Sequence, residues 1–176
     1  MINTKPVLLV MGGFAQIYDI VQRAKEKGIY VIVTDYLQDS PAKRIADESY
    51  MISITDVDGI VNLCKERSVD GVMNYCIDPG QKPYQQICER LGLSCYGTKE
   101  QFDILTNKDL FYDACLKNNV DVVPRYNLQV DCNMSQLSGV EFPIVVKPAD
   151  GRASRGITIC TDEKEVPHAI EKALSF

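Results

Sequence analysis

The sequence predicts an α/β fold built on a Rossmann-like parallel sheet, and three observations carry this prediction. Strand-like and helix-like patterns alternate over the first 100 residues, as they do when helices connect parallel strands. Residues 7–11 form a short continuous apolar run, which is typical of a strand covered on both faces. Gly12 and Gly13 follow this run and turn the chain into a helical pattern.

Each further element of this first part follows from a local pattern. Apolar residues at three- and four-residue steps predict a helix over residues 14–27, which Gly28 ends. Asp56 is suited to cap a second helix, and a third covers residues 82–91 before Gly92. Apolar and β-branched runs predict further strands over residues 30–35, 50–54, 71–74 and 93–96.

After residue 97 the pattern changes, and the chain divides into segments 1–97 and 98–176. Residues 98–102 and 107–117 have the pattern of two successive helices, the second with an apolar face. Short strands are then expected around residues 125–130, 144–147 and 157–160, followed by a last helix over residues 162–174.

Length and composition limit the classes of function. At 176 residues the chain can hold one ordinary domain, or one small domain and part of another. Its net charge of −5 argues against a nucleic-acid partner, which would require a basic face, but still allows ATP at a locally positive site. No segment reaches the roughly 20 apolar residues of a membrane span, and the N-terminus lacks the apolar core of a signal peptide. We expect a cytoplasmic protein without a membrane partner.

The cysteines and the histidine indicate neither a metal centre nor histidine-based catalysis. The seven cysteines form no C-x-x-C pair and are odd in number, so neither a complete disulfide framework nor a zinc site is expected. Most of them lie in apolar segments, and we expect them to be reduced and structural. The single histidine, His168, lies in a polar stretch and is expected on the solvent side of a helix.

Two lysines are the leading candidates for a functional site. Lys108 begins the helical segment 107–117, and Lys147 ends an apolar run and opens a loop that carries two glycines before the next run. A lysine ammonium at the edge of a sheet lowers the cost of binding a polyphosphate, and glycine lets backbone N–H groups approach it. The spacing alone equally fits a hairpin in which Lys147 extends from the rim into solvent.

The turn at Gly12 and Gly13 raises the alternative of a dinucleotide site. Asp35 lies at the end of the second predicted strand, where an acid that binds ribose is expected. The turn lacks the G-x-G-x-x-G pattern, however, and the chain has no Walker motif. Gly12, Gly13, Asp35 and Asn74 all lie at the carboxyl ends of predicted strands, and the carboxyl edge of an open parallel sheet commonly binds ligands. Turn residues that merely end strands explain them equally well.

In combination, these segments resemble the ATP-grasp superfamily, in the branch that contains biotin carboxylase, carbamoyl-phosphate synthetase and the purine-pathway carboxylate–amine ligases. Residues 1–97 are similar to its N-terminal pre-ATP-grasp domain, and residues 98–176 to the first, incomplete part of its α+β ATP-grasp domain. The matching motifs, in chain order, are N-K-D-L-F at 107–111, N-V-D-V-V-P at 119–124, F-P-I-V-V-K-P at 142–148 and S-R-G-I at 154–157.

The resemblance implies roles for individual residues. The two lysines would contact the phosphates of ATP, and residues 150–156 would close over the β- and γ-phosphates through backbone N–H groups. The implied cofactor contacts are Lys108, Lys147, Asp150, Gly151, Ser154, Arg155 and Gly156. The candidates for the substrate site are Gly12, Gly13, Asp35 and Asn74. The resemblance assigns no catalytic side chain.

The reaction implied by the resemblance is phosphoryl transfer from ATP to a carboxylate. The acyl phosphate is then attacked by an amine or another nucleophile, and ADP is released. Positioning and charge neutralisation dominate such a reaction, which suits a chain without an evident catalytic triad. Magnesium would bridge the phosphates. Its Glu and Asn ligands and the adenine-binding segment would follow Phe176, so we expect this chain to be a fragment of a longer enzyme and to be inactive by itself.

Two other function classes stay open. A Rossmann-type NAD-binding oxidoreductase domain would use the Gly12–Gly13 turn, and a non-catalytic module would bind a metabolite at the sheet edge. Neither explains why the two lysines and the loop occur in this order. The expected partners are small-molecule carboxylate and nucleophile substrates. Exposed apolar surface at the incomplete domain would also favour self-association as a homodimer.

Overall fold

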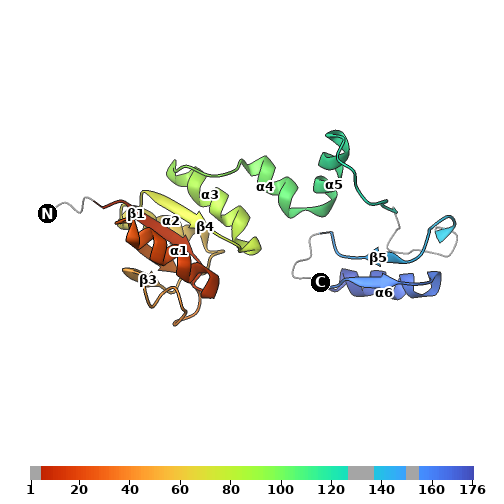
Figure 1. The fold of residues 1–176 in the computed structure, drawn as a ribbon, viewed down its shortest axis with the longest axis horizontal. Coiled ribbons are helices and arrows are strands. Elements are labelled where there is room, and N and C mark those ends of the chain that lie inside the picture. Colours follow the sequence, from red (N-terminus) through yellow and green to blue (C-terminus); the bar gives the residue numbers. More distant parts are fainter. Residues whose placement is uncertain (1–4, 127–136, 150–154) are drawn as a thin grey trace. The chain divides into compact units, whose positions relative to one another are not determined.

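The computed structural model describes residues 5–126, 137–149 and 155–176. The chain divides into two compact units, Met1–Asp103 and Ile104–Phe176, and each contains one sheet (Figure 1). The division falls within helix α4 (Lys99–Thr106), whereas the sequence places the boundary just ahead of this helix.

The first unit contains the predicted parallel sheet. Its strands have the order β3–β2–β1–β4, and each neighbouring pair is parallel, which confirms the predicted α/β class. The strands are β1 (Val7–Met11), β2 (Tyr30–Thr34), β3 (Glu48–Tyr50) and β4 (Gly71–Asn74). The helices are α1 (Ala15–Glu26), α2 (Val57–Glu66), the short η1 (Asp78–Gly80) and α3 (Gln81–Leu91).

Helices cover both faces of this sheet. Val10 and Val33 pack with the buried side of α1 on one face. Leu9 and Met11 pack with α2 and α3 on the other. Because side chains alternate between the two faces of a strand, burial on both faces requires a continuous apolar run, and β1 provides one.

The helix boundaries follow the predicted signals. The carboxylate of Asp56 accepts a hydrogen bond from the backbone N–H of Gly59 at 2.9 Å and so caps α2. Gly92, with φ +64°, ends α3 in the left-handed conformation that glycine adopts without strain. Gly28 follows α1 with φ +77°.

The predicted fifth strand over residues 93–96 is wrong. The segment instead turns back on α3: the N–H of Leu93 donates to the Cys88 carbonyl at 2.9 Å, and the Tyr96 N–H donates to the Tyr84 hydroxyl at 3.4 Å. The Tyr96 ring also stacks on Tyr84, with 4.4 Å between ring centres. Backbone donors used in this way cannot join a strand ladder. The predicted third strand is shifted, because β3 begins at Glu48 and ends at Tyr50.

The second unit is smaller and has an antiparallel strand pair. Its strands pair with Val145 opposite Ile159, and α6 covers one face of the pair through Val166 and Ala169. The predicted strand around residues 125–130 lies mostly outside the described residues. The elements are α5 (Lys108–Lys117), β5 (Ile144–Val146), β6 (Thr158–Cys160), the short η3 (Glu163–Glu165) and α6 (Val166–Leu174).

Three of the described cysteines, Cys64, Cys88 and Cys160, are buried as expected, whereas Cys76 is exposed. The described cysteines are free thiols, and Cys64 and Cys88 are buried in the core of the first unit. Burial raises the pKa of Cys64 to about 11 and that of Cys88 to about 12, so both thiols are protonated, as structural cysteines are. The His168 side chain is 84% exposed on α6. Within the described ranges, no helix combines the length and apolar character needed to cross a membrane.

A polar network secures the edge strand β3. The Glu48 carboxylate accepts hydrogen bonds from the hydroxyls of Tyr50 and Tyr30, and it lies 3.2 Å from Nε of Arg67. The hydrogen bond from Tyr50, followed by those other contacts, lowers the pKa of Glu48. The ionised carboxylate therefore stabilises the folded state. This stabilisation is present above the pKa of an unfolded glutamate and is lost as the pH falls through the lower folded pKa.

We predict that Glu48→Gln lowers the free energy of unfolding at pH 7 by about 1 kcal/mol, because the amide accepts hydrogen bonds less strongly and has no charge to pair with Arg67. As the pH falls below about 4, the wild-type protein should lose this advantage and the two stabilities should converge. Urea unfolding over a series of pH values measures both effects. Glu66→Gln is the matched control, because Glu66 is 3.9 Å from Arg67 but 69% exposed. Equal losses of unfolding free energy in Glu48→Gln and Glu66→Gln would contradict the stabilising role assigned to the Glu48 carboxylate.

Candidate functional site

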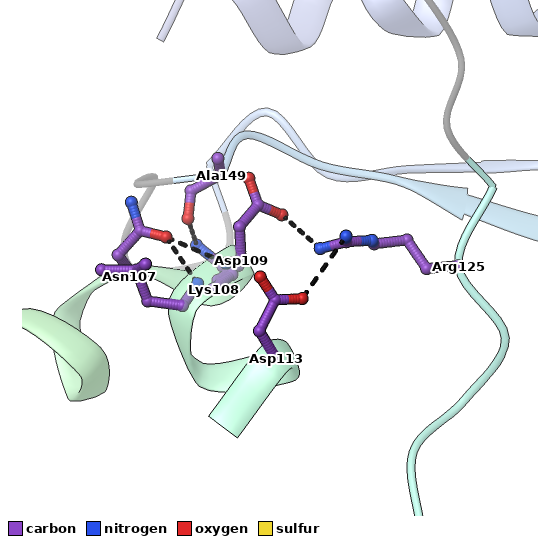
Figure 2. Close-up of polar contacts among 7 residues, drawn as sticks. Asn107, Lys108, Asp109, Asp113, Arg125 and Ala149 are labelled. Atoms are coloured by element: carbon purple, nitrogen blue, oxygen red, sulfur yellow. Dashed lines mark hydrogen bonds and ion pairs between the residues drawn. The ribbon is translucent and has the colours of Figure 1, made fainter. Parts of the chain in front are cut away.

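The N-terminus of α5 is fixed by Asn107. Its side-chain oxygen accepts hydrogen bonds from the backbone N–H groups of Asp109 and Leu110, both at 3.0 Å (Figure 2). An asparagine cap satisfies N–H groups that have no partner within the helix. Lys108 is the first residue of α5, so the cap fixes the backbone from which its side chain extends.

Lys108 contacts the chain just beyond β5. Both its backbone N–H and its ammonium donate to the carbonyl oxygen of Ala149, with distances of 3.2 Å from N and 3.3 Å from Nζ (Figure 2). Ala149 lies two residues after Lys147, which directly follows β5. The structure therefore brings the segments that carry the two predicted lysines into contact. A simple hairpin with Lys147 at its rim gives no reason for this contact with α5.

The outer face of the β5–β6 pair is apolar and exposed. Its inner positions, such as Ile144 and Cys160, pack in the small core with α6. On the outer face Val145 and Ile159 lie opposite each other and are 56% and 65% exposed. Lys147 directly follows β5 and is exposed. Sequence reasoning missed this surface, since both faces of the pair have apolar residues.

Only part of the predicted phosphate loop can be placed. Asp150, Gly151 and Ser154 lie outside the described residues, and Arg155 is exposed. Gly156 is buried with φ +70°, and a Cβ atom there would lie 2.8 Å from Cγ of Pro148 and 3.0 Å from Cδ2 of Phe176. Local packing and backbone conformation therefore already require glycine at position 156. Its contact with phosphate stays a prediction.

In the first unit, Asp35 ties the Gly12–Gly13 turn to the end of β2. One carboxylate oxygen accepts the N–H of Gly13 at 2.6 Å, and the other accepts the N–H of Leu37 at 2.8 Å. The residue is 7% exposed. Both oxygens are thus engaged by the protein's own backbone, which argues against ribose binding by Asp35 and disfavours the NAD alternative.

Protein atoms fill the space beside both glycines of this turn. A Cβ atom at Gly12 would lie 2.3 Å from Cδ1 of Ile77, and one at Gly13 would lie 1.9 Å from Oγ of Ser40. The Ser40 hydroxyl is buried and has no hydrogen-bond partner among the described residues. Close packing explains both glycines, and their contact with substrate stays a prediction.

Asn74 reaches the same edge of the sheet, because it pairs with Met11 in the β1–β4 ladder. Its side-chain amide donates to the Ile77 carbonyl at 3.1 Å and closes the loop after β4. The amide oxygen is buried without a hydrogen-bond partner among the described residues, and the residue is 3% exposed. The observed role of Asn74 is to close this loop, and a role in substrate binding stays a prediction.

The chain is similar to a known family model and to several known proteins. Residues 7–83 match a family model described as the PylC-like N-terminal domain. The 2-oxoglutarate carboxylase small subunit of Hydrogenobacter thermophilus is 25% identical over 169 residues, which are 88% of this chain and 35% of that protein. The formate-dependent phosphoribosylglycinamide formyltransferase of Prochlorococcus marinus is 24% identical over 169 residues, which are 95% of this chain and 43% of that protein.

Solved structures share the fold. The N5-carboxyaminoimidazole ribonucleotide synthetase from Thermotoga maritima has a TM-score of 0.73 and 24% identity, over 93% of this chain and 43% of its own. The biotin carboxylase from Campylobacter jejuni has a TM-score of 0.78 and 18% identity, over 96% of this chain and 41% of its own. This chain therefore spans less than half the length of these relatives.

We predict that Gly13→Ala lowers the free energy of unfolding by about 2 kcal/mol, because the added Cβ atom would overlap Ser40. The Gly13→Ala/Ser40→Gly double variant should regain part of the loss, since it removes the atom in the way. Urea unfolding of the single and double variants measures the effect. An unchanged stability in Gly13→Ala would show that the turn is not packed as described.

Proposed function

We propose that this chain supplies two lysines that bind the phosphates of ATP in a longer ligase. The proposal starts from the match of the chain to the N-terminal portion of ATP-grasp superfamily ligases, which its sequence also predicts. The enzyme activates a carboxylate as an acyl phosphate for attack by an amine or another nucleophile, with release of ADP.

The contact of Lys108 with Ala149 is the observation that carries this proposal. Through one carbonyl oxygen, the helix that begins at Lys108 is joined to the segment that carries Lys147. An ammonium group is a compact charge that binds a phosphate oxygen without fixed geometry. Two such groups on adjoining segments can offset more of the charge of a triphosphate than a single lysine can.

The outer face of the β5–β6 pair supports a nucleotide in particular. Val145 and Ile159 form an exposed aliphatic surface, and Lys147 directly follows the strand that carries Val145. Ligand sites commonly combine apolar walls with a few placed polar groups. An apolar surface for a base, next to a cation for phosphates, matches the two halves of ATP.

In this reaction Lys108 and Lys147 would bind and orient the phosphates of ATP and would not themselves react. An oxygen of the carboxylate attacks the γ-phosphorus, the bond from that phosphorus to the β–γ bridging oxygen breaks, and ADP leaves. The nucleophile then attacks the acyl carbon, and inorganic phosphate leaves. Lys108 and Lys147 would neutralise charge on the phosphates throughout, which is the main demand of phosphoryl transfer.

Magnesium is expected from the resemblance to bridge the phosphates of ATP. In ranges 5–126, 137–149 and 155–176, no group of three or more His, Cys, Asp or Glu side chains could hold a metal ion. Metal ligands beyond Phe176 therefore stay a prediction. The same holds for acceptor contacts at Gly12, Gly13, Asp35 and Asn74, for a homodimer and for a cytoplasmic location.

We predict that Lys108→Ala and Lys147→Ala each weaken the binding of ATP by the intact enzyme at least about tenfold, because each removes a charge that compensates the phosphates. Isothermal titration calorimetry measures the dissociation constants. Lys117→Ala removes an equal charge from the last turn of α5 and should leave the affinity within about twofold. Wild-type affinity in both test variants would refute the proposed site.

A further inference from the structure

Arg125 contacts three side chains of the helix that begins with Lys108. Its Nη1 lies 3.1 Å from Asp109 Oδ1, and its Nη2 lies 3.6 Å from Asp113 Oδ1. Figure 2 shows both carboxylates directed toward the guanidinium. The guanidinium carbon is also 4.5 Å from the centre of the Tyr112 ring. A planar guanidinium has donors on two nitrogens in a fixed fork and a face that packs on an aromatic ring, so one arginine can contact two carboxylates and a tyrosine together.

Asp109 and Asp113 would otherwise place uncompensated negative charge near the proposed phosphate site. They are four residues apart on one helix, where like charges repel. Asp109 adjoins Lys108, and the rise of the helix puts Asp113 roughly 8 Å from Lys108 along the helix axis, which is within a Debye length of about 10 Å at 0.1 M salt. Both carboxylates would therefore oppose a polyphosphate held by Lys108, and Arg125 offsets their charge.

The residue after Arg125 contacts the chain that leads into β5. The hydroxyl of Tyr126 accepts a hydrogen bond from the backbone N–H of Glu141 at 3.3 Å. Glu141 lies three residues before β5, and Lys147 directly follows that strand. Two adjacent residues thus connect the helix that carries Lys108 with the segment that leads to Lys147.

We propose that Arg125 is a positioning residue for the phosphate site. It offsets the charges of Asp109 and Asp113 and, with Tyr126, holds α5 beside the segment that leads to Lys147. This inference rests on the proposed function, because it requires the two lysines to bind one polyphosphate. Exposed ion pairs of this kind contribute little to stability, so the effect of Arg125 should be seen in anion affinity rather than in unfolding.

The test is the affinity of the intact protein for inorganic tripolyphosphate and for ATP, measured by calorimetry at low and high salt. Arg125→Ala should weaken both affinities about three- to tenfold at low salt and less at high salt, because screening reduces the repulsion. Adding Asp109→Asn and Asp113→Asn to Arg125→Ala should restore most of the affinity. Arg125→Lys should lie between Arg125→Ala and wild type, because it keeps the charge but loses the two-pronged contact.

Two further variants serve as controls. Arg90→Ala breaks a similar exposed pair in the first unit, where Nη1 of Arg90 lies 2.7 Å from Asp58, and should not change either affinity. Asp109→Asn/Asp113→Asn leaves Arg125 in place and should bind tripolyphosphate about two- to fivefold more tightly than wild type. This second variant keeps the inference testable if Arg125→Ala does not fold.

The outcomes separate this inference from the function on which it rests. If Lys108→Ala loses affinity while Arg125→Ala binds both probes like wild type at low salt, the role of Arg125 is refuted and the proposed function stands. If the asparagine substitutions restore nothing, charge compensation by Arg125 is refuted. If wild type binds neither probe, both proposals fail.

Discussion

The double contact of Lys108 with the Ala149 carbonyl is the interaction on which the candidate site depends. A backbone N–H and an ammonium from the start of one helix share one acceptor on the segment that follows β5. Asn107 fixes the helix end from which both donors extend. Because the helix start and the chain after the strand are joined at this point, two lysines from separate parts of the sequence lie on adjoining segments.

The first unit is organised around a different constraint, which is the tight turn after β1. Asp35 uses both carboxylate oxygens on backbone N–H groups, and Ser40 and Ile77 occupy the space that larger residues at the turn would need. These features explain the residues at the sheet edge through packing. The candidate site therefore lies in the second unit, where Lys147 directly follows a strand pair with an exposed apolar surface.

The sequence was sufficient for the parallel sheet and for most helix ends in the first unit, because apolar runs, Gly28, Asp56 and Gly92 act locally. It failed at residues 93–96, since an apolar segment looks the same whether its backbone donors join a strand or α3. It could not anticipate the Ala149 contact, whose acceptor is a backbone atom that no residue type encodes. The sequence also made Asp35 a candidate ribose ligand. An aspartate at the end of this strand can either bind a ribose or accept hydrogen bonds from the backbone of the turn, and the sequence is the same in both cases.

The most direct test of this account follows the side-chain ammonium signals of Lys108 and Lys147 by nuclear magnetic resonance during titration with a non-hydrolysable ATP analogue. If both lysines bind one triphosphate, both signals shift along one saturation curve with the same dissociation constant. A shift of only one signal, or of neither at saturation, would contradict the shared phosphate site.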